Sequence, residues 1–292
     1  MRTQEDGAAY AEALPSNFAA GWQLDAPENA EASAGNKEDE VVVSATSVSK
    51  FVPATWQALQ ARFDDGPLSL SLILPEGLPA ELHAALHATN RKRFVLLSGL
   101  SGTGKTSVAR AYAKAYCRAL DLEVWHDRYA QVAVRPDWTD PTGLLGFVNA
   151  IADPPTFQAA EALHLLLAAD ADRGRPYFLC LDEMNLARVE HYFAPFLSAM
   201  EGQTGTLALH GELGAIDNVQ PRIPWPENLF IFGTVNMDES THPFSDKVLD
   251  RAFTFEFWDV DLIAWEPESG KGKLLRLFSR KWPNTCALCM RH

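Results

Sequence analysis

The sequence predicts an α/β fold of three layers, in which a mostly parallel, five-stranded sheet lies between helices. Short apolar runs alternate along the chain with segments whose apolar residues repeat at helical spacing, a pattern typical of open parallel sheets. A glycine-rich loop at residues 99–106 joins one apolar run to the next helical segment, and Asp182 and Glu183 follow a later apolar run. Both features are expected at the carboxyl edge of the sheet, where such folds bind their ligands.

The glycine-rich loop, GLSGTGKT at residues 99–106, fits the phosphate-binding pattern G-x-x-x-x-G-K-[ST], the Walker A motif or P-loop. A predicted strand at residues 94–97 precedes it and a predicted helix at residues 107–120 follows. Glycines let backbone N–H groups approach a polyphosphate, and the helix adds the positive end of its dipole. We expect Lys105 on the β and γ phosphates and the Thr106 hydroxyl on Mg²⁺. The predicted nucleotide-binding residues are Gly99, Leu100, Ser101, Gly102, Thr103, Gly104, Lys105, Thr106 and Ser107.

An acidic pair follows the nearly continuous apolar run at residues 177–181. In P-loop enzymes the first acid after such a strand holds the Mg²⁺ shell, and a second acid can polarise the attacking water. We therefore expect Asp182 at the metal together with Thr106, and Glu183 in catalysis. An acidic cap on the next helix is the alternative for this pair.

Two further polar residues occupy informative positions. Asn236 ends the apolar run that follows Pro226 and is predicted to point to the γ phosphate, or alternatively to cap a turn. Arg251 lies between a short predicted helix and a predicted strand at residues 253–257. It is predicted to supply a positive finger to a neighbouring subunit, with a surface ion pair as the alternative. The predicted catalytic residues are Lys105, Glu183, Asn236 and Arg251.

Periodicity and turn residues place the remaining elements of the fold. Helices are predicted at residues 51–61, 79–93, 157–170 and 186–200. Strands are predicted at residues 68–75 and 129–134, a loop at 135–147, and a hairpin within 202–217. His83 and His87 lie four residues apart, a spacing that can bind zinc, but Ala84 replaces the glutamate of a metalloprotease helix, so packing or surface roles are expected.

Four motifs together resemble the AAA+ ATPases: the loop at residues 99–106, CLDEMN at 180–185, GTVNMD at 233–238 and LDR at 249–251. Within them, the chain is similar to the MoxR and dynein-related branch, which includes the NTPase subunit of McrBC-type modification-dependent restriction systems. LDEMN followed by SAME, GTVNMDES and DPTGLLG carry this finer similarity. The resemblance covers about residues 78–265.

The resemblance implies a core that binds and hydrolyses ATP with Mg²⁺ and drives remodelling or translocation. It implies a homo-oligomeric ring, commonly a hexamer, with a restriction-type nuclease as a partner and DNA bound only indirectly. The matching positions make Lys105 and Thr106 Walker A residues, Asp182 and Glu183 Walker B residues, Asn236 sensor 1 and Arg251 an arginine finger. The restriction-type subunit prefers GTP and has N-T-A-D at the sensor, whereas this chain has N-M-D-E from Asn236, which favours ATP.

The chain is expected to divide into four parts. Residues 1–48 are a disordered acidic leader by composition, residues 49–77 a short extension, residues 78–265 the AAA+ core, and residues 266–292 an irregular basic tail. An AAA+ core normally continues into a helical lid, and the sequence leaves no room for one, consistent with truncation or a frame shift. The tail also contains Cys286, Cys289 and His292, but a closed structural zinc site needs four ligands, so a disordered end is expected.

Composition excludes several classes of protein. The formal charge of −13 over 292 residues argues against a nucleic-acid contact spread over the whole surface. No run approaches twenty apolar residues and the first thirty residues lack a secretory signal, so a cytoplasmic protein without membrane contact is expected. Cys117 and Cys180 fall in apolar segments and are expected as small core residues.

Two alternative functions remain open from the sequence. A P-loop kinase would pass the γ phosphoryl group to a small molecule, although it does not need the Asp-Glu pair, the Asn-ended strand and Arg251 in this order. A non-hydrolysing nucleotide-binding or assembly protein is favoured by the missing lid.

Overall fold

The computed structural model describes residues 50–64, 77–202, 205–212, 214–237, 242–261 and 276–280. They belong to one compact unit, Val48–His292. Some predictions lie outside the described residues: the acidic leader at 1–48, the strand at 68–75 and the cysteine-containing end of the tail.

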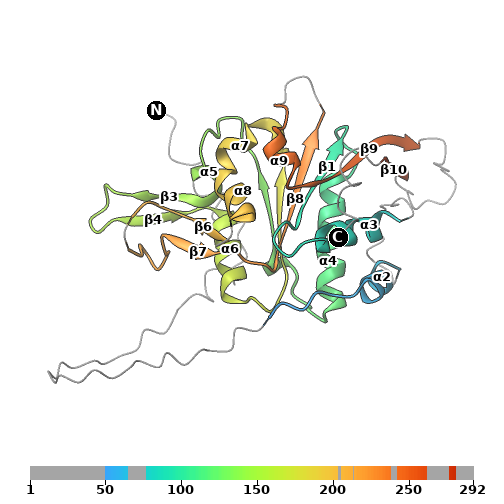
Figure 1. Cartoon of the computed structure of the whole chain (residues 1–292), viewed down its shortest axis with the longest axis horizontal. Coiled ribbons are helices and arrows are strands. Elements are labelled where there is room, and N and C mark those ends of the chain that lie inside the picture. Colours follow the sequence, from blue (N-terminus) through green and yellow to red (C-terminus); the bar gives the residue numbers. More distant parts are fainter. Residues whose placement is uncertain are drawn as a thin grey trace, which may run out of the picture. The chain divides into compact units, whose positions relative to one another are not determined.

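The described part of the chain contains a six-stranded central sheet in the order β10-β9-β1-β8-β5-β2 (Figure 1). Its strands are β1 (Phe94–Gly99), β2 (Tyr129–Ala133), β5 (Tyr177–Asp182), β8 (Leu229–Asn236), β9 (Phe253–Asp261) and β10 (Arg276–Arg280). The five strands from β9 to β2 are parallel to their neighbours, which confirms the predicted five-stranded parallel sheet. Strand β10 adds to it by pairing antiparallel with β9.

Strand β10 lies within residues 266–292, where the sequence analysis expects an irregular tail. Strand β9 continues beyond Phe257, its last residue paired with β1, and its outer edge pairs with β10 from Arg276 to Arg280. An edge of unpaired backbone groups favours such an addition. This pairing between distant segments explains why local composition did not predict the strand.

Helices cover both faces of the sheet. One face packs against α2 (Trp56–Asp64), α3 (Leu78–His87) and α4 (Lys105–Ala119). The other packs against α5 (Thr142–Leu145), α6 (Glu161–Ala171), α7 (Val189–Tyr192), α8 (Ala194–Glu201) and α9 (Asp246–Leu249). Along β1, Val95 and Leu97 pack in the apolar cluster with α2, α3 and α4, whereas Phe94 and Leu96 pack in the cluster on the other face. The sheet is therefore buried on both sides, as expected for parallel strands, and the three-layer prediction is confirmed.

Two small antiparallel pairs lie beside the central sheet; the sequence analysis did not predict the first and placed the second within residues 202–217. Strand β3 (Gly146–Asn149) pairs with β4 (Thr156–Ala159), so helix α6 begins only at Glu161. Strand β6 (Thr206–Ala208) pairs with β7 (Arg222–Pro224), not within residues 202–217 as predicted. The buried side chains of Leu207 and Ile223 lie opposite each other in this pair. Burial between segments separated in sequence therefore decides the pairing.

The single helix predicted at residues 186–200 is instead three short elements. These are the 3₁₀ helix η3 (Met184–Leu186), α7 and α8. Pro195 stands in the first turn of α8, a position that suits proline because no helical N–H partner is needed there. The preceding Phe193 leaves helical geometry, with φ −99° and ψ 4°. The apolar periodicity thus continues across a break in the backbone.

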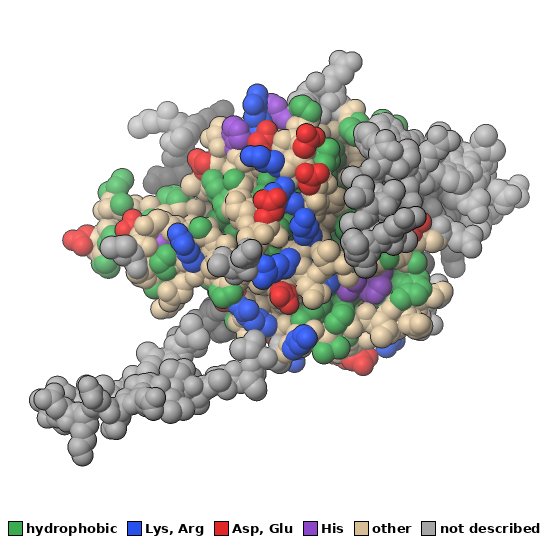
Figure 2. Space-filling view, viewed as in Figure 1, with side chains coloured by type: hydrophobic (Ala, Val, Ile, Leu, Met, Phe, Trp, Pro, Cys, Tyr) green, Lys and Arg blue, Asp and Glu red, His purple; other side chains and the backbone are tan. Residues whose placement is uncertain are grey.

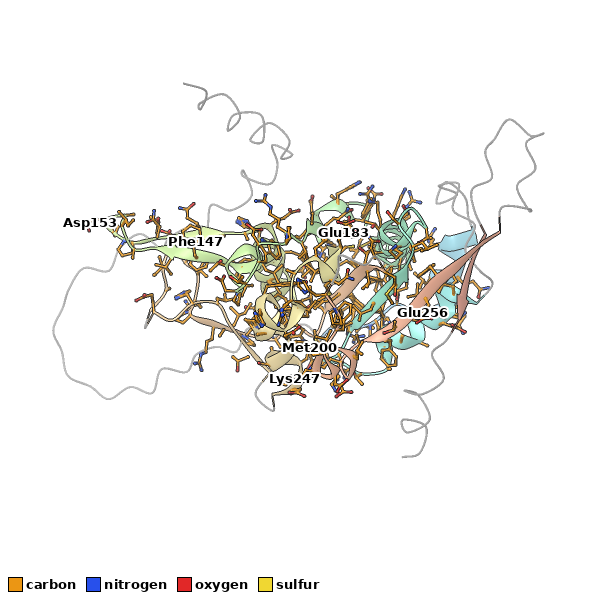
Figure 3. The ribbon with its side chains drawn as sticks, turned by 90° about the horizontal axis from the view of Figure 1, so that it is seen from above. Phe147, Asp153, Glu183, Met200, Lys247 and Glu256 are labelled. Atoms are coloured by element: carbon orange, nitrogen blue, oxygen red, sulfur yellow. The ribbon has the colours of Figure 1, made fainter. Side chains whose placement is uncertain are left out.

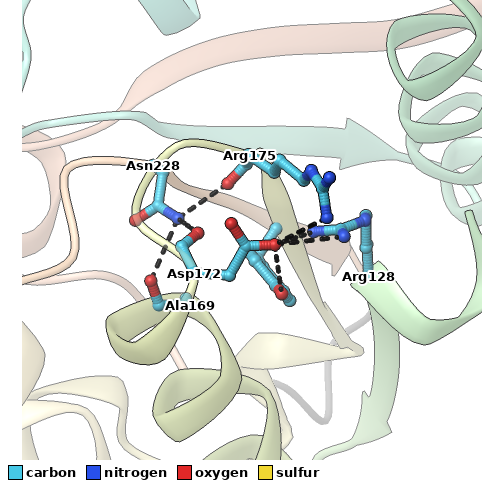
Figure 4. A network of polar contacts seen from close by, with 6 residues as sticks. Arg128, Ala169, Asp172, Arg175 and Asn228 are labelled. Atoms are coloured by element: carbon cyan, nitrogen blue, oxygen red, sulfur yellow. Dashed lines mark hydrogen bonds and ion pairs between the residues drawn. The ribbon is translucent and has the colours of Figure 1, made fainter. Parts of the chain in front are cut away.

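A polar network joins the loops that precede β5 and β8 (Figure 4). The side-chain Nδ2 of Asn228 donates to the backbone oxygens of Ala169, Asp172 and Arg175 at 3.1, 2.9 and 2.7 Å. The Asp172 carboxylate accepts from both terminal nitrogens of Arg128 at 3.1 and 3.2 Å. These contacts satisfy loop carbonyls and a charge at the amino end of the two strands.

His83 and His87 join helix α3 to helix α4. The ring of His83 hydrogen bonds to the Tyr112 hydroxyl at 3.0 Å, and His87 Nε2 to the Tyr116 hydroxyl at 2.9 Å. His87 Nδ1 donates to the backbone oxygen of His83 at 2.8 Å, which fixes the neutral tautomer. Burial lowers the pKa of His87 to about 4. The packing role expected for both histidines is therefore the one observed.

Cys117 and Cys180 are free and fully buried, which confirms their predicted place in the core. Burial raises the pKa of each thiol to about 12. Among the described residues, the helices lack the combination of length and apolar character that a membrane crossing requires. On the face seen in Figure 2, basic and acidic side chains are interspersed.

Candidate active site

The phosphate loop connects β1 to α4, as predicted. Gly99 has a φ of 152°, and a Cβ atom there would lie 2.2 Å from the backbone oxygen of Phe257 on β9. Only glycine therefore fits this first position of the loop. Gly104 immediately precedes α4 with a left-handed φ of 81°, so that the helix begins at Lys105 and its amino end faces the loop.

A cavity of about 360 Å³ opens at the carboxyl edge of the sheet. Its lining comes from the phosphate loop, the end of β5 and the end of β8, and comprises Ser101, Gly102, Gly104, Lys105, Thr106, Ser107, Asp182, Glu183, Thr234 and Asn236. Strand β8 lies between β1 and β5 in the sheet, which is why segments far apart in sequence meet here. Viewed from above, Glu183 lies between the β3–β4 hairpin, marked by Phe147 and Asp153, and Glu256 on β9 (Figure 3).

The predicted loop residues divide into two groups. Most of them line the cavity, whereas Gly99, Leu100 and Thr103 are not part of its lining. The Lys105 ammonium donates to the backbone oxygens of Gly99 at 3.0 Å and Leu100 at 2.6 Å. Lys105 is only 5% exposed, so its charge sits at the base of the loop, next to the space that an anion would occupy.

The predicted metal residues are in direct contact. Asp182 Oδ1 accepts hydrogen bonds from the hydroxyls of Thr106 at 2.8 Å and Thr234 at 2.6 Å. Its Oδ2 accepts from Gln131 Nε2 at 3.3 Å. The set offers hydroxyl and carboxylate oxygens, which are the ligands that Mg²⁺ prefers. These residues fit the metal: Thr106 and Asp182 would hold Mg²⁺ at this place.

Glu183 and Asn236 are also brought together. Asn236 Nδ2 donates to Glu183 Oε1 at 2.7 Å, and Asn185 Nδ2 donates to the backbone oxygen of Asn236 at 2.7 Å. Glu183 has a left-handed backbone, with φ 53° and ψ 49°, and makes no side-chain cap for the 3₁₀ helix η3. The capping alternative for Glu183 therefore does not describe its side chain. Glu183 and Asn236 both point to the cavity.

The sequence analysis missed three polar residues of this site, Gln131, Asn185 and Thr234. Thr234 is a buried polar residue in a strand that is otherwise almost entirely apolar, and it stands two residues before Asn236. Residues two apart in a strand share a face, so this spacing was the available signal. Gln131 is likewise a polar residue within the short strand β2.

Arg251 is not part of the cavity lining of its own chain. It is 6% exposed, and its Nε donates to the backbone oxygen of Leu197 on α8 at 3.3 Å. The guanidinium also contacts the backbone oxygen of Lys247 and forms an ion pair with Glu201. The hydrogen bond from Arg251 lowers the pKa of Glu201. In this conformation Arg251 joins α9 to α8.

Residues 76–213 match a family model described as the AAA ATPase domain. A comparison with curated proteins gave no match. The matched residues include the phosphate loop and the acidic pair, and the match supports nucleotide binding and ATPase activity in general terms. Asn236 and Arg251 lie beyond the matched residues, and the structure adds Asn236 to the site through its contact with Glu183.

Proposed function

We propose that this chain is the core of an AAA+ ATPase, which binds and hydrolyses ATP with Mg²⁺ to drive remodelling or translocation in a ring. One observation carries the proposal: Lys105, the Thr106–Asp182 pair and the Glu183–Asn236 pair line a single cavity. The AAA domain match supports the same function in general terms.

Each residue has a distinct task in this proposal. The loop N–H groups and Lys105 bind the phosphates. Thr106 donates its proton to Asp182, which leaves the lone pairs of its hydroxyl oxygen free for Mg²⁺, and the bound metal would neutralise phosphate charge. Glu183 accepts a proton from the attacking water, and Asn236 holds the Glu183 carboxylate at the cavity.

The loop assignment is tested with Lys105→Ala in the full chain. We expect at least about 100-fold weaker binding of ATP in an equilibrium titration, because the variant removes the charge at the base of the cavity. Lys114→Ala, on the same helix but outside the cavity lining, is the matched control and should bind normally. Normal affinity of Lys105→Ala would refute the assignment.

Hydrolysis is favoured over the two alternatives by the contact between Glu183 and Asn236. A kinase requires an acceptor molecule, whereas the proposed enzyme releases phosphate from ATP and Mg²⁺ alone. A protein that only binds nucleotide would show affinity without turnover. Measuring phosphate release beside affinity, with GTP as the competing nucleotide, distinguishes these outcomes and tests the preference for ATP.

The ring, the nuclease partner, the MoxR and McrB-like branch and a cytoplasmic location are also part of the proposal. The ring is supported by the AAA domain match, because such domains often oligomerise. A role for Arg251 as a finger in a neighbouring site requires its guanidinium to leave Glu201 and the carbonyl of Leu197. Sedimentation of the full chain with and without ATP and Mg²⁺ tests the assembly.

A further inference from the structure

Thr234 contacts both acids of the site through one hydroxyl group. Its Oγ1 donates to Asp182 Oδ1 at 2.6 Å and accepts from the backbone nitrogen of Glu183 at 2.9 Å. A hydroxyl has one proton and two acceptor lone pairs, so this arrangement uses its proton on the carboxylate. Thr234 is only 2% exposed, and water therefore cannot readily replace either bond.

The backbone explains why a side chain is needed at this point. The pairing of β5 with β8 has its last partners at Leu181 and Gly233. Beyond them the chain turns into the left-handed conformation of Glu183, and the N–H of Glu183 bonds to the Thr234 hydroxyl. Thr234 thus fixes the place where the strand ends and the direction in which Glu183 leaves it.

Two residues on one face of β8 hydrogen bond to different parts of the acidic pair. Thr234 holds the Asp182 carboxylate and the Glu183 backbone, while Asn236 holds the Glu183 carboxylate. Because both donors come from the same strand, the distance between the metal acid and the water-activating acid depends on that strand.

We propose that Thr234 is a positioning residue, which sets the Mg²⁺-binding acid and the water-activating acid relative to each other. This inference rests on the proposed ATP hydrolysis. Loss of the hydroxyl frees the Asp182 carboxylate to rotate and leaves the Glu183 N–H without its partner. Binding of the phosphates by the loop does not use Thr234, so nucleotide affinity without Mg²⁺ is preserved.

The test compares Thr234→Val, which keeps the shape and removes the hydroxyl, with Thr234→Ser, which keeps the hydroxyl. ATP affinity is measured in EDTA and in Mg²⁺, and phosphate release gives kcat and KM. For Thr234→Val we expect affinity in EDTA within about threefold of wild type, and about 10- to 100-fold losses in the Mg²⁺ enhancement of affinity and in kcat. Thr234→Ser should recover most of both, and Thr254→Val on β9, outside the cavity lining, should match wild type.

Wild-type Mg²⁺ dependence and kcat in Thr234→Val would overturn the inference. Equal losses in Thr234→Val and Thr234→Ser would also overturn it, because the hydroxyl would then not be the cause. If Thr234→Val does not fold by circular dichroism, Thr234→Cys, a weak donor of similar size, replaces it in the same comparison with serine. Failure of the wild-type chain to bind ATP would refute the proposed function and not the role of Thr234. If the wild-type chain binds ATP without turnover, the increase of ATP affinity by Mg²⁺ is the readout that tests Thr234.

Discussion

Polar residues lie at both ends of strands β5 and β8, but the carboxylates at the two ends have different partners. At the amino end, the Asp172 carboxylate is paired with the Arg128 guanidinium, and the Asn228 amide nitrogen contacts three backbone carbonyl oxygens. At the carboxyl end, the Asp182 and Glu183 carboxylates accept hydrogen bonds from neutral hydroxyl and amide groups. Neutral donors orient a carboxylate without cancelling its charge. The comparison teaches that the hydrogen-bond partner of a carboxylate indicates whether the carboxylate is available to a cation.

The largest expected effect tests the carboxyl end. Glu183→Gln keeps the size of the side chain and its contact with Asn236 but cannot accept the proton of water. We expect ATP binding to persist while phosphate release falls at least about 100-fold. Asp172→Asn, which changes the acid at the other end, should retain the wild-type rate in its folded form. A wild-type rate in Glu183→Gln would remove this residue from the mechanism and break the comparison.

The next effect tests the amino end. Asn228 is 1% exposed, and Asn228→Ala removes the donor shared by three backbone carbonyls. We expect the free energy of unfolding in urea to fall by about 2–3 kcal/mol, with unchanged ATP affinity of the folded protein. Asn90→Ala, at an exposed position, should stay within about 0.5 kcal/mol of wild type. If Asn228→Ala lost ATP affinity without losing stability, the structural role assigned to the amino end would be wrong.

A smaller effect concerns pH and the histidines between α3 and α4. Burial lowers the pKa of His87 from 6.5 to about 4, and the nearby Arg93 acts in the same direction. Between these values the unfolded chain binds a proton that the folded chain excludes, so stability is complete above about pH 6.5 and falls as the pH drops toward 4. After allowance for partial exposure, the loss is on the order of 2 kcal/mol.

Urea unfolding at pH 7 and pH 5 measures part of this loss, because the loss is complete only as the pH approaches 4. His87→Gln should show a smaller difference between the two pH values than wild type, whereas the exposed His126→Gln should show the same difference. Equal pH dependence in all three proteins would contradict the role of His87. The result sharpens the comparison, because it assigns part of the pH dependence of the unfolding free energy to the contact between α3 and α4 and not to the acids at the cavity.

Much of the site could be predicted because its signals are local. The phosphate loop is one short motif, and Asp182, Glu183 and Asn236 each end an apolar run that reads as a buried strand. Ends of parallel strands meet at one edge of a sheet, so the sequence could place these residues together before any distance was known. The five parallel strands were predictable for the same reason.

The missed features depend on neighbours that the sequence does not reveal. The role of Thr234 requires β8 to lie beside β5, which only the strand order shows. The β3–β4 and β6–β7 pairs are short, and β6 and β7 are joined by a connection that local patterns do not define. The sequence alone indicates a surface residue at a helix end for Arg251, and its burial comes with contacts to Leu197 and Glu201 on α8.

The left-handed backbone of Glu183 lowers the stability of the folded chain while it presents the carboxylate to the cavity. A left-handed conformation costs a non-glycine residue about 1 kcal/mol or more, and glycine would adopt it freely. Replacement of Glu183 by glycine would relieve this backbone strain but would remove the carboxylate from the cavity. In the proposed mechanism, the Glu183 carboxylate that this backbone presents to the cavity accepts the proton of the attacking water.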